Sequence, residues 1–150
     1  MSRRVALLVS AGVVALGGAG AFAFAYAGEQ PPALEKSTAR YTAPKGKGDG
    51  SLTFSTDVTA NSGVKSVKVL AWPQDSSLGK KGLTAKDMAD AESATCTPAE
   101  DDKVHCTYKV AVTSFEAEAS PHGAWHVAVL ATAKNGTTTL DTTAADFTLR

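Results

Sequence analysis

Residues 104–113, VHCTYKVAVT, alternate between a largely apolar set of side chains and a largely polar set. In an extended chain successive side chains point to opposite faces, so a period of two predicts a strand with one face on a core and the other in solvent. The inward set is Val104, Cys106, Tyr108, Val110 and Val112. This stretch is the strongest strand signal in the chain, and it predicts that Cys106 points inward.

The same alternation recurs elsewhere between turn signals. The further strands are carried by Leu52, Phe54 and Val58, by Val67, Val69 and Ala71, by Trp125, Val127, Val129, Ala131 and Ala133, and by a last strand that includes Phe147 and Leu149. Turn residues separate them: Gly48-Asp49-Gly50, Asn61-Ser62-Gly63, Pro73, and Asn135-Gly136, which favours a tight hairpin with positive φ. Several short strands between such turns predict an all-β fold, an antiparallel β-sandwich over residues 34–150.

Two stretches have helical character. Residues 83–94 are helix-compatible, Thr84 is a suitable N-cap, and Asp87 three residues later favours a helix start, so we expect one short helix there. Ser114 to Ala119, with Ser114 as cap and Glu116 in the first turn, predicts a second helical turn.

The N-terminus has the three parts of an export signal. Arg3-Arg4 is followed by an uncharged apolar run from Val5, and Ala25-Tyr26-Ala27 supplies the small residues of a cleavage site. We therefore predict a helical signal peptide at 1–27, a linker at 28–33 and secretion of the rest. The alternative is a membrane anchor formed by residues 5–27, since that run is long enough to span a bilayer. Its glycines, and the lack of a basic cluster after Ala27, favour cleavage.

Charge excludes one class of partner. Without residues 1–27, the chain carries 13 basic and 15 acidic residues, with interspersed signs. A nucleic-acid-binding domain clusters Lys and Arg on one face, so we expect no nucleic-acid partner. The expected partner is a protein or a component of the cell envelope, and a membrane only if the signal segment is not cleaved.

The two cysteines, Cys96 and Cys106, both lie in the exported part, where disulfides persist. We predict that they pair, closing a loop of about 11 residues that would contribute roughly 3 kcal/mol to stability. A redox-active or metal-binding pair is the weaker alternative, because the spacing is not C-x-x-C and no larger ligand cluster surrounds it.

Two resemblances follow from longer stretches. Residues 62–69, SGVKSVKV, and 123–129, GAWHVAV, resemble the third and sixth core strands of bacterial immunoglobulin-like domains, with Trp125 where a corner tyrosine often stands. The resemblance implies an immunoglobulin-like sandwich. The chain as a whole also resembles small secreted Streptomyces-type proteins, in a domain-of-unknown-function family. That resemblance implies actinobacterial origin and export, and it transfers no catalytic residue or ligand.

The histidines do not suggest a metal site. His122 and His126 have a spacing that joins ligands on a helix, but Pro121 and Gly123 favour a turn into a strand. His126 and His105 both point outward by alternation, so we interpret them as surface residues.

No catalytic motif is present either. Glu100-Asp101-Asp102 reads as a hairpin tip, and no serine lies in Gly-x-Ser-x-Gly or Ser-x-x-Lys. We expect no catalytic residue, cofactor or metal, and a non-enzymatic secreted binding or structural module. The alternative is a small secreted hydrolase or hydrolase inhibitor.

The candidate binding surface is an outer sheet face. If Val67, Val69 and Ala71 point inward, Leu70 and Trp72 point outward. In the immunoglobulin arrangement their strand pairs with that of His126, Ala128 and Leu130, so the outer faces merge into an apolar patch. The candidate residues are Leu70, Trp72, His126 and Leu130. Such a patch is a binding surface or is covered, here by the expected helix through Leu83 and Met88.

Overall fold

The computed structural model describes residues 30–150, so the predicted signal peptide at 1–27 lies outside the described residues. Along the chain, the elements are β1 (Ala33–Thr42), β2 (Gly50–Thr59), β3 (Val64–Pro73), α2 (Ser77–Lys81), the 3-10 helix η2 (Ala85–Met88), β4 (Glu92–Ser93), β5 (Thr95–Glu100), β6 (Lys103–Val112), α3 (Ser114–Ala119), β7 (Gly123–Ala133) and β8 (Thr138–Leu149). From residue 30 onward, no helix is long and apolar enough to cross a membrane.

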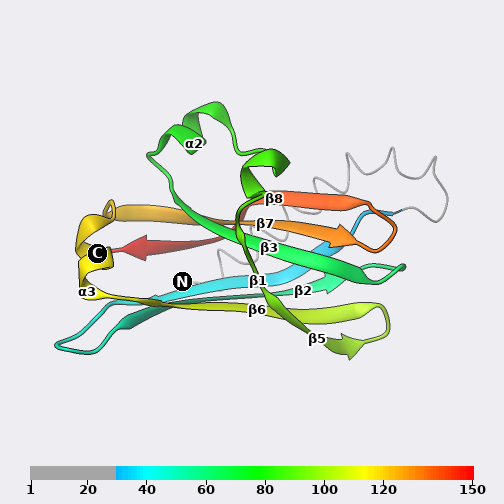
Figure 1. Cartoon of the computed structure of the whole chain (residues 1–150), viewed down its shortest axis with the longest axis horizontal. Coiled ribbons are helices and arrows are strands. Elements are labelled where there is room, and N and C mark those ends of the chain that lie inside the picture. Colours follow the sequence, from blue (N-terminus) through cyan, green and yellow to red (C-terminus); the bar gives the residue numbers. More distant parts are fainter. Residues whose placement is uncertain (1–29) are drawn as a thin grey trace.

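The strands form two four-stranded antiparallel sheets that face each other as a β-sandwich (Figure 1). One sheet has the order β1-β2-β6-β5 and the other has the order β4-β3-β7-β8. The sandwich predicted from alternation is therefore confirmed at the level of two antiparallel sheets.

The core lies between the sheets and follows the alternation. In β2, Leu52, Phe54 and Val58 are buried while their neighbours are partly exposed, and Cys106 of β6 is fully buried. Val67 and Val69 of β3 and Val127 and Val129 of β7 close the core from the other sheet. Tyr108 also links the sheets, since its hydroxyl donates to Glu92 Oε1 at 2.7 Å. Burial, together with that carboxylate, raises the pKa of Tyr108 to about 12.

The helix expected over residues 83–94 is shorter than predicted. Only Ala85–Met88 is helical, as a 3-10 turn, although Thr84 is its N-cap and forms a capping box with Asp87. Residues 92–93 instead pair with Lys68 and Val69 as the short edge strand β4, because extended pairing satisfies their backbone groups. The sequence did not predict α2.

The second helical turn is present, but Thr113, not Ser114, caps it. The Thr113 hydroxyl accepts a hydrogen bond from the Glu116 amide at 3.1 Å, and the Glu116 carboxylate accepts one from the Thr113 amide at 2.8 Å. The bonds that the Glu116 carboxylate accepts from the Thr113 amide and hydroxyl lower the pKa of Glu116. A cap must stand just before the first helical residue with extended backbone, and Thr113 meets that condition.

The two ends of the sandwich differ, and we name them for what they carry. At the Gln30 pole, the Thr137 hydroxyl in the β7–β8 hairpin donates to the Gln30 backbone oxygen. Gly136 in that hairpin has the positive φ that the Asn-Gly signal predicted, 90°, whereas Asn135 does not have a positive φ. The α3 pole, at the opposite end, carries α3 and the C-terminus (Figure 1).

Candidate functional site

The predicted outer patch forms but is covered. Leu70 pairs with Ala128, and Trp72 pairs with His126, so their outer faces merge as expected. Trp72, however, is only 7% exposed, and Leu70 and Leu130 are partly buried around it. The segment 74–91, with α2 and η2, packs over this face (Figure 1). Trp72 is therefore not available as a binding residue, which corrects the exposed-surface hypothesis and supports the covered alternative.

The cover packs tightly on Trp72. Met88 is fully buried and Leu83 is 8% exposed, both in contact with the Trp72 cluster. At Gly79 an added Cβ would lie 2.6 Å from the Gln74 backbone oxygen and 3.2 Å from Trp72 Cζ3, so α2 approaches the indole as closely as only glycine permits. A surface this closely packed is core, and its apolar residues are explained by folding.

His126 also belongs to this covered cluster. Its ring lies 4.7 Å from the Trp72 ring, its side chain is 16% exposed, and its Nδ1 is 2.5 Å from Asp146 Oδ1. The prediction of an ordinary surface histidine is wrong here, because the cover encloses the outer face. Nearby, Asp141 is buried with its Oδ2 unpaired, and burial raises the pKa of this carboxyl.

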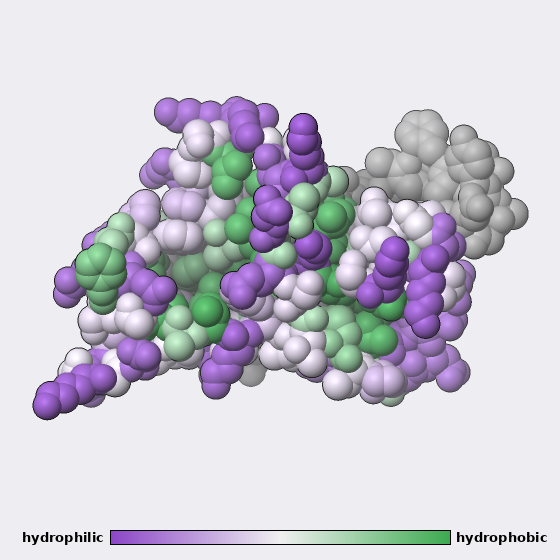
Figure 2. All heavy atoms as spheres, viewed as in Figure 1, coloured by the Kyte–Doolittle hydropathy of each residue, from purple (hydrophilic) through white to green (hydrophobic). Residues whose placement is uncertain are grey.

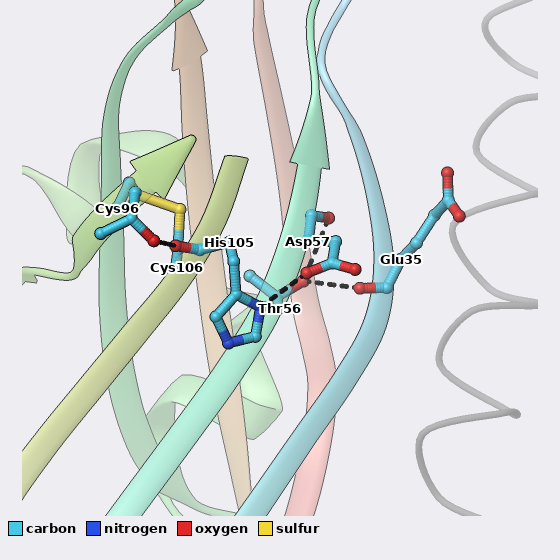
Figure 3. The surroundings of a disulfide bond; sticks show 7 residues. Glu35, Thr56, Asp57, Cys96, His105 and Cys106 are labelled. Carbon is cyan, nitrogen blue, oxygen red and sulfur yellow. Dashed lines mark hydrogen bonds and ion pairs between the residues drawn. A yellow bond between two sulfur atoms is a disulfide. The ribbon is translucent and has the colours of Figure 1, made fainter. Parts of the chain in front are cut away.

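The predicted disulfide is present, and it joins facing residues of β5 and β6 (Figure 3). On the opposite side of β6, His105 Nδ1 lies 2.7 Å from Asp57 Oδ1 on β2. In the next position of β2, the buried Thr56 hydroxyl donates to the Glu35 backbone oxygen of β1 at 3.1 Å. Figure 3 shows these contacts at successive strands of the sheet, and the half-exposed pair of His105 with Asp57 joins β6 to β2.

Neither histidine–carboxylate pair is assembled into a catalytic triad in the described part of the chain. A triad needs a hydroxyl or thiol hydrogen-bonded to the second imidazole nitrogen, and the hydrogen bonds of His105 and His126 run to carboxylates alone. His122 is exposed in the turn before β7. Over residues 30–150, no three His, Cys, Asp or Glu side chains gather as metal ligands.

An open pocket lies at the α3 pole, between the ends of the two sheets. Its volume is about 100 Å³. The lining is predominantly apolar and comes from both sheets and the chain after α3: Tyr41, Leu52, Ala71, Val112, Ser120, Trp125, Phe147 and Leu149. The sandwich is thus incompletely filled at this end.

Three aromatic rings line one side of the pocket. Phe147 lies between the other two, with ring centroids 5.9 Å from Tyr41 and 5.8 Å from Trp125, and both pairs are stacked. The indole of Trp125 donates to the Pro121 backbone oxygen at 2.8 Å, which fixes the loop that leaves α3. The Tyr41 hydroxyl is buried without a hydrogen-bond partner.

Beside the pocket, α3 exposes an aromatic side chain. Phe115 is 79% exposed, and among the described residues it is the one large hydrophobic side chain that stands in solvent. Figure 2 shows apolar atoms protruding at the end of the molecule where Figure 1 places α3. Val112, two residues before α3, and Ser120, directly after it, both line the pocket. The α3 helix itself buries no residue and is held by its capping box.

Comparison with known proteins identifies a family but no function. Residues 34–131 match the model of a family described as a family of unknown function, DUF5707. The chain belongs to this family. No curated protein and no solved structure matches the chain. The match assigns no functional residue to this DUF5707 member.

The sequence reasoning missed the pocket and Phe115. The pocket residues come from six strands, and the alternation pattern places their side chains inward without showing that the space between them is unfilled. Phe115 carried a usable signal. It is an aromatic residue in the first turn of a short predicted helix that has too few apolar partners for a buried face.

Proposed function

We propose that this protein is a secreted, non-enzymatic binding or structural module that acts outside the cell or at the cell envelope, with the α3 pole as its binding end. The observation that carries the proposal is the exposed Phe115 beside an open apolar pocket. Exposed aromatic residues next to apolar hollows are characteristic of interaction sites, where such anchors supply most of the binding energy.

The strand order supports an immunoglobulin-like identity for the sandwich. The sheets β1-β2-β6-β5 and β4-β3-β7-β8 correspond to the ABED sheet and to a CFG sheet with one added edge strand. Trp125 stands where a corner tyrosine is expected, and its indole bonds to a backbone oxygen four residues upstream. An N–H donor thus serves where a tyrosine hydroxyl usually does.

The described residues begin at the end of the domain opposite the pocket, which supports the α3 pole as the binding end. The predicted signal at 1–27 leads into the domain at the Gln30 pole, where the Gln30 backbone oxygen meets Thr137. On β7 (Gly123–Ala133), eight residue steps separate Trp125 of the pocket from Ala133 beside the hairpin, about 26 Å. If the protein is held by its N-terminus, the α3 pole lies at the end of the domain away from the attachment.

The hydrolase alternative has less support. It would use a histidine–carboxylate pair, and the more enclosed one, His126 with Asp146, lies under the cover next to Trp72. Among the described residues, the side-chain hydrogen bond of His126 runs to Asp146, and no hydroxyl or thiol is hydrogen-bonded to its ring.

Site-specific photo-cross-linking tests the proposal. A photoreactive phenylalanine analogue replaces Phe115 in one variant and Lys134, exposed in the hairpin at the Gln30 pole, in the control variant. We expect a defined adduct from position 115 in culture medium or envelope fractions, and none from position 134. Equal labelling from both positions, or no adduct from position 115, would overturn the α3 pole as a binding end.

A further inference from the structure

The α3 pole carries an exposed phenyl ring and, beside it, an open pocket lined by aromatic and aliphatic side chains. We propose that the pocket takes Phe115 of a second copy of this chain, so that two copies associate through their α3 poles. This inference rests on the proposed function and names the partner of the same site.

The chemistry of the pocket suits an aromatic ring, and its open side lets part of a ring enter. An enclosed apolar cavity of about 150 Å³ can hold a benzene molecule, and this pocket of about 100 Å³ is open on one side. The edge of a ring can therefore enter, while the rest of the ring and its backbone stay outside. The guest would meet the stacked rings of Tyr41, Phe147 and Trp125, and aromatic pairs gain energy beyond the area they bury.

Phe115 does not fill the pocket of its own chain. It is 79% exposed, on a helix that buries no residue, so its ring is free for another molecule. A two-fold contact uses the same patch on both subunits, so that residue i meets j while j meets i. The α3 pole can form such a contact, because Phe115 of each copy can enter the pocket of the other copy.

Charge at the α3 pole is also self-complementary. The hairpin after β1 exposes Lys45, Lys47 and Asp49, a net charge of +1, while α3 exposes Glu118 and Glu116, whose carboxylate also accepts the capping bonds of Thr113. Figure 1 shows this hairpin and α3 at the same end of the molecule. A two-fold contact can set the basic hairpin of one copy against the acidic helix of the other. Such rim charges steer association and fix its register.

Sedimentation velocity of the protein as its host produces it tests the inference. Between about 1 μM and about 1 mM, where small interfaces associate, we expect a reversible monomer–dimer equilibrium. The change Phe115→Ser should weaken the dimer by roughly 100-fold, because it removes two anchors, each worth about tenfold. The control Lys134→Ser, at the Gln30 pole, should leave the equilibrium unchanged.

A mixing experiment tests the contact itself. Ala71→Leu fills the pocket from its wall, and its thermal unfolding is recorded to confirm that the variant is folded. Each variant alone lacks both contacts, whereas a mixture of Ala71→Leu with Phe115→Ser retains one ring in one pocket. We expect the mixture to form more dimer than either variant alone.

Three results would overturn the inference: a wild-type protein that stays monomeric over the whole range, a dimer that Phe115→Ser leaves intact, or a mixture no better than its components. The cross-linking experiment separates this failure from that of the proposed function. An adduct of position 115 with a different molecule, in a protein that stays monomeric, removes the self-association and keeps the binding end.

Discussion

Two tryptophans lie one register position apart on the β3–β7 pair, and they end in opposite situations. Trp72 pairs with His126 on the outer face, and Trp125 pairs with Pro73 on the inner face at the mouth of the sandwich. The outer tryptophan is 7% exposed, while the inner one is only partly buried and lines an open pocket. In this domain, the sheet face on which a side chain lies therefore does not decide whether the side chain is buried or exposed.

The indole hydrogen bonds show the same contrast. Trp72 donates to the Thr142 backbone oxygen, 70 residues away, at an irregularity where the pairing of β7 with β8 shifts register between Val127 and Val129. Trp125 donates to Pro121, four residues away. The first bond ties distant parts of the fold together, and the second fixes a local turn. Trp72 therefore contributes mainly to the stability of the domain, and Trp125 mainly to the conformation of the loop at the α3 pole.

The largest expected effect comes from removing Trp72. Trp72→Ala should lower the free energy of unfolding by about 3 to 5 kcal/mol, because it leaves a cavity under the cover and an unpaired carbonyl in β8. Denaturant unfolding monitored by circular dichroism measures the loss. Trp125→Ala is the matched control, with an expected loss of about 1 to 2 kcal/mol because its ring is only partly buried. Equal losses at the two positions would mean that Trp72 and Trp125 contribute equally to the stability of the domain.

Sequence reasoning succeeded where side-chain period and burial agree. In β2, every second residue from Gly50 to Val58 is buried, so alternation alone gave this strand and its face. It failed for β1, where Ser37 is buried, Lys36 has a φ of 53°, and the register shifts between Glu35 and Thr38. A bulge of this kind breaks the period of two, and with it the signal.

Strand β5 was missed for a different reason. All but one of its residues are exposed, and it contains Pro98, so its composition resembles a loop. The disulfide from Cys96 to Cys106, within a register-matched pair, holds it at the sheet edge. The candidate site shows the same limit, because the cover over Trp72 and the unfilled α3 pole depend on how elements distant in sequence pack.

The stability lost with the disulfide can be compared with the losses expected at Trp72 and Trp125. The double change Cys96→Ser with Cys106→Ser should cost roughly 2 to 4 kcal/mol, because a bridge acts mainly on the unfolded chain. Thermal unfolding with and without reductant measures it, and alkylation with mass spectrometry should find no free thiol in the untreated protein. Since the effect is global, the difference between Trp72→Ala and Trp125→Ala should persist in the reduced protein. Two freely alkylated cysteines in native protein would contradict the pairing.

A pH-dependent effect is expected under the cover. Burial raises the folded-state pKa of Asp141 above the ordinary 3.8, so the folded protein holds this proton longer than the unfolded chain. As the pH rises through 3.8 toward that raised value, the unfolded chain ionises first and stability falls.

Asp141→Asn removes this titration and keeps a side-chain oxygen for the Thr143 amide, which donates to Asp141 Oδ1 at 3.0 Å. The stability of the wild type relative to this variant should therefore decrease as pH rises through that window. Urea unfolding of both proteins at a series of pH values measures the trend. A relative stability that is flat, or that increases with pH, would show that Asp141 is not desolvated as the structure indicates.

The smallest expected effect is at Phe115, and it completes the comparison. A phenyl ring that is 79% exposed, on a helix with no buried residue, contributes little to folding, so Phe115→Ala should change the free energy of unfolding by less than about 0.5 kcal/mol. The matched control is Met88→Ala, a fully buried side chain on a helical turn of the cover, which should cost about 2 to 5 kcal/mol. The measurement is denaturant unfolding at a protein concentration low enough to exclude association, since a dimer would add its own stability. A loss above about 1 kcal/mol for Phe115→Ala in the monomer would mean that the ring packs within its own chain in solution. The α3 pole would then lose its exposed anchor, and the difference between its surface and the covered face of Trp72 would no longer hold.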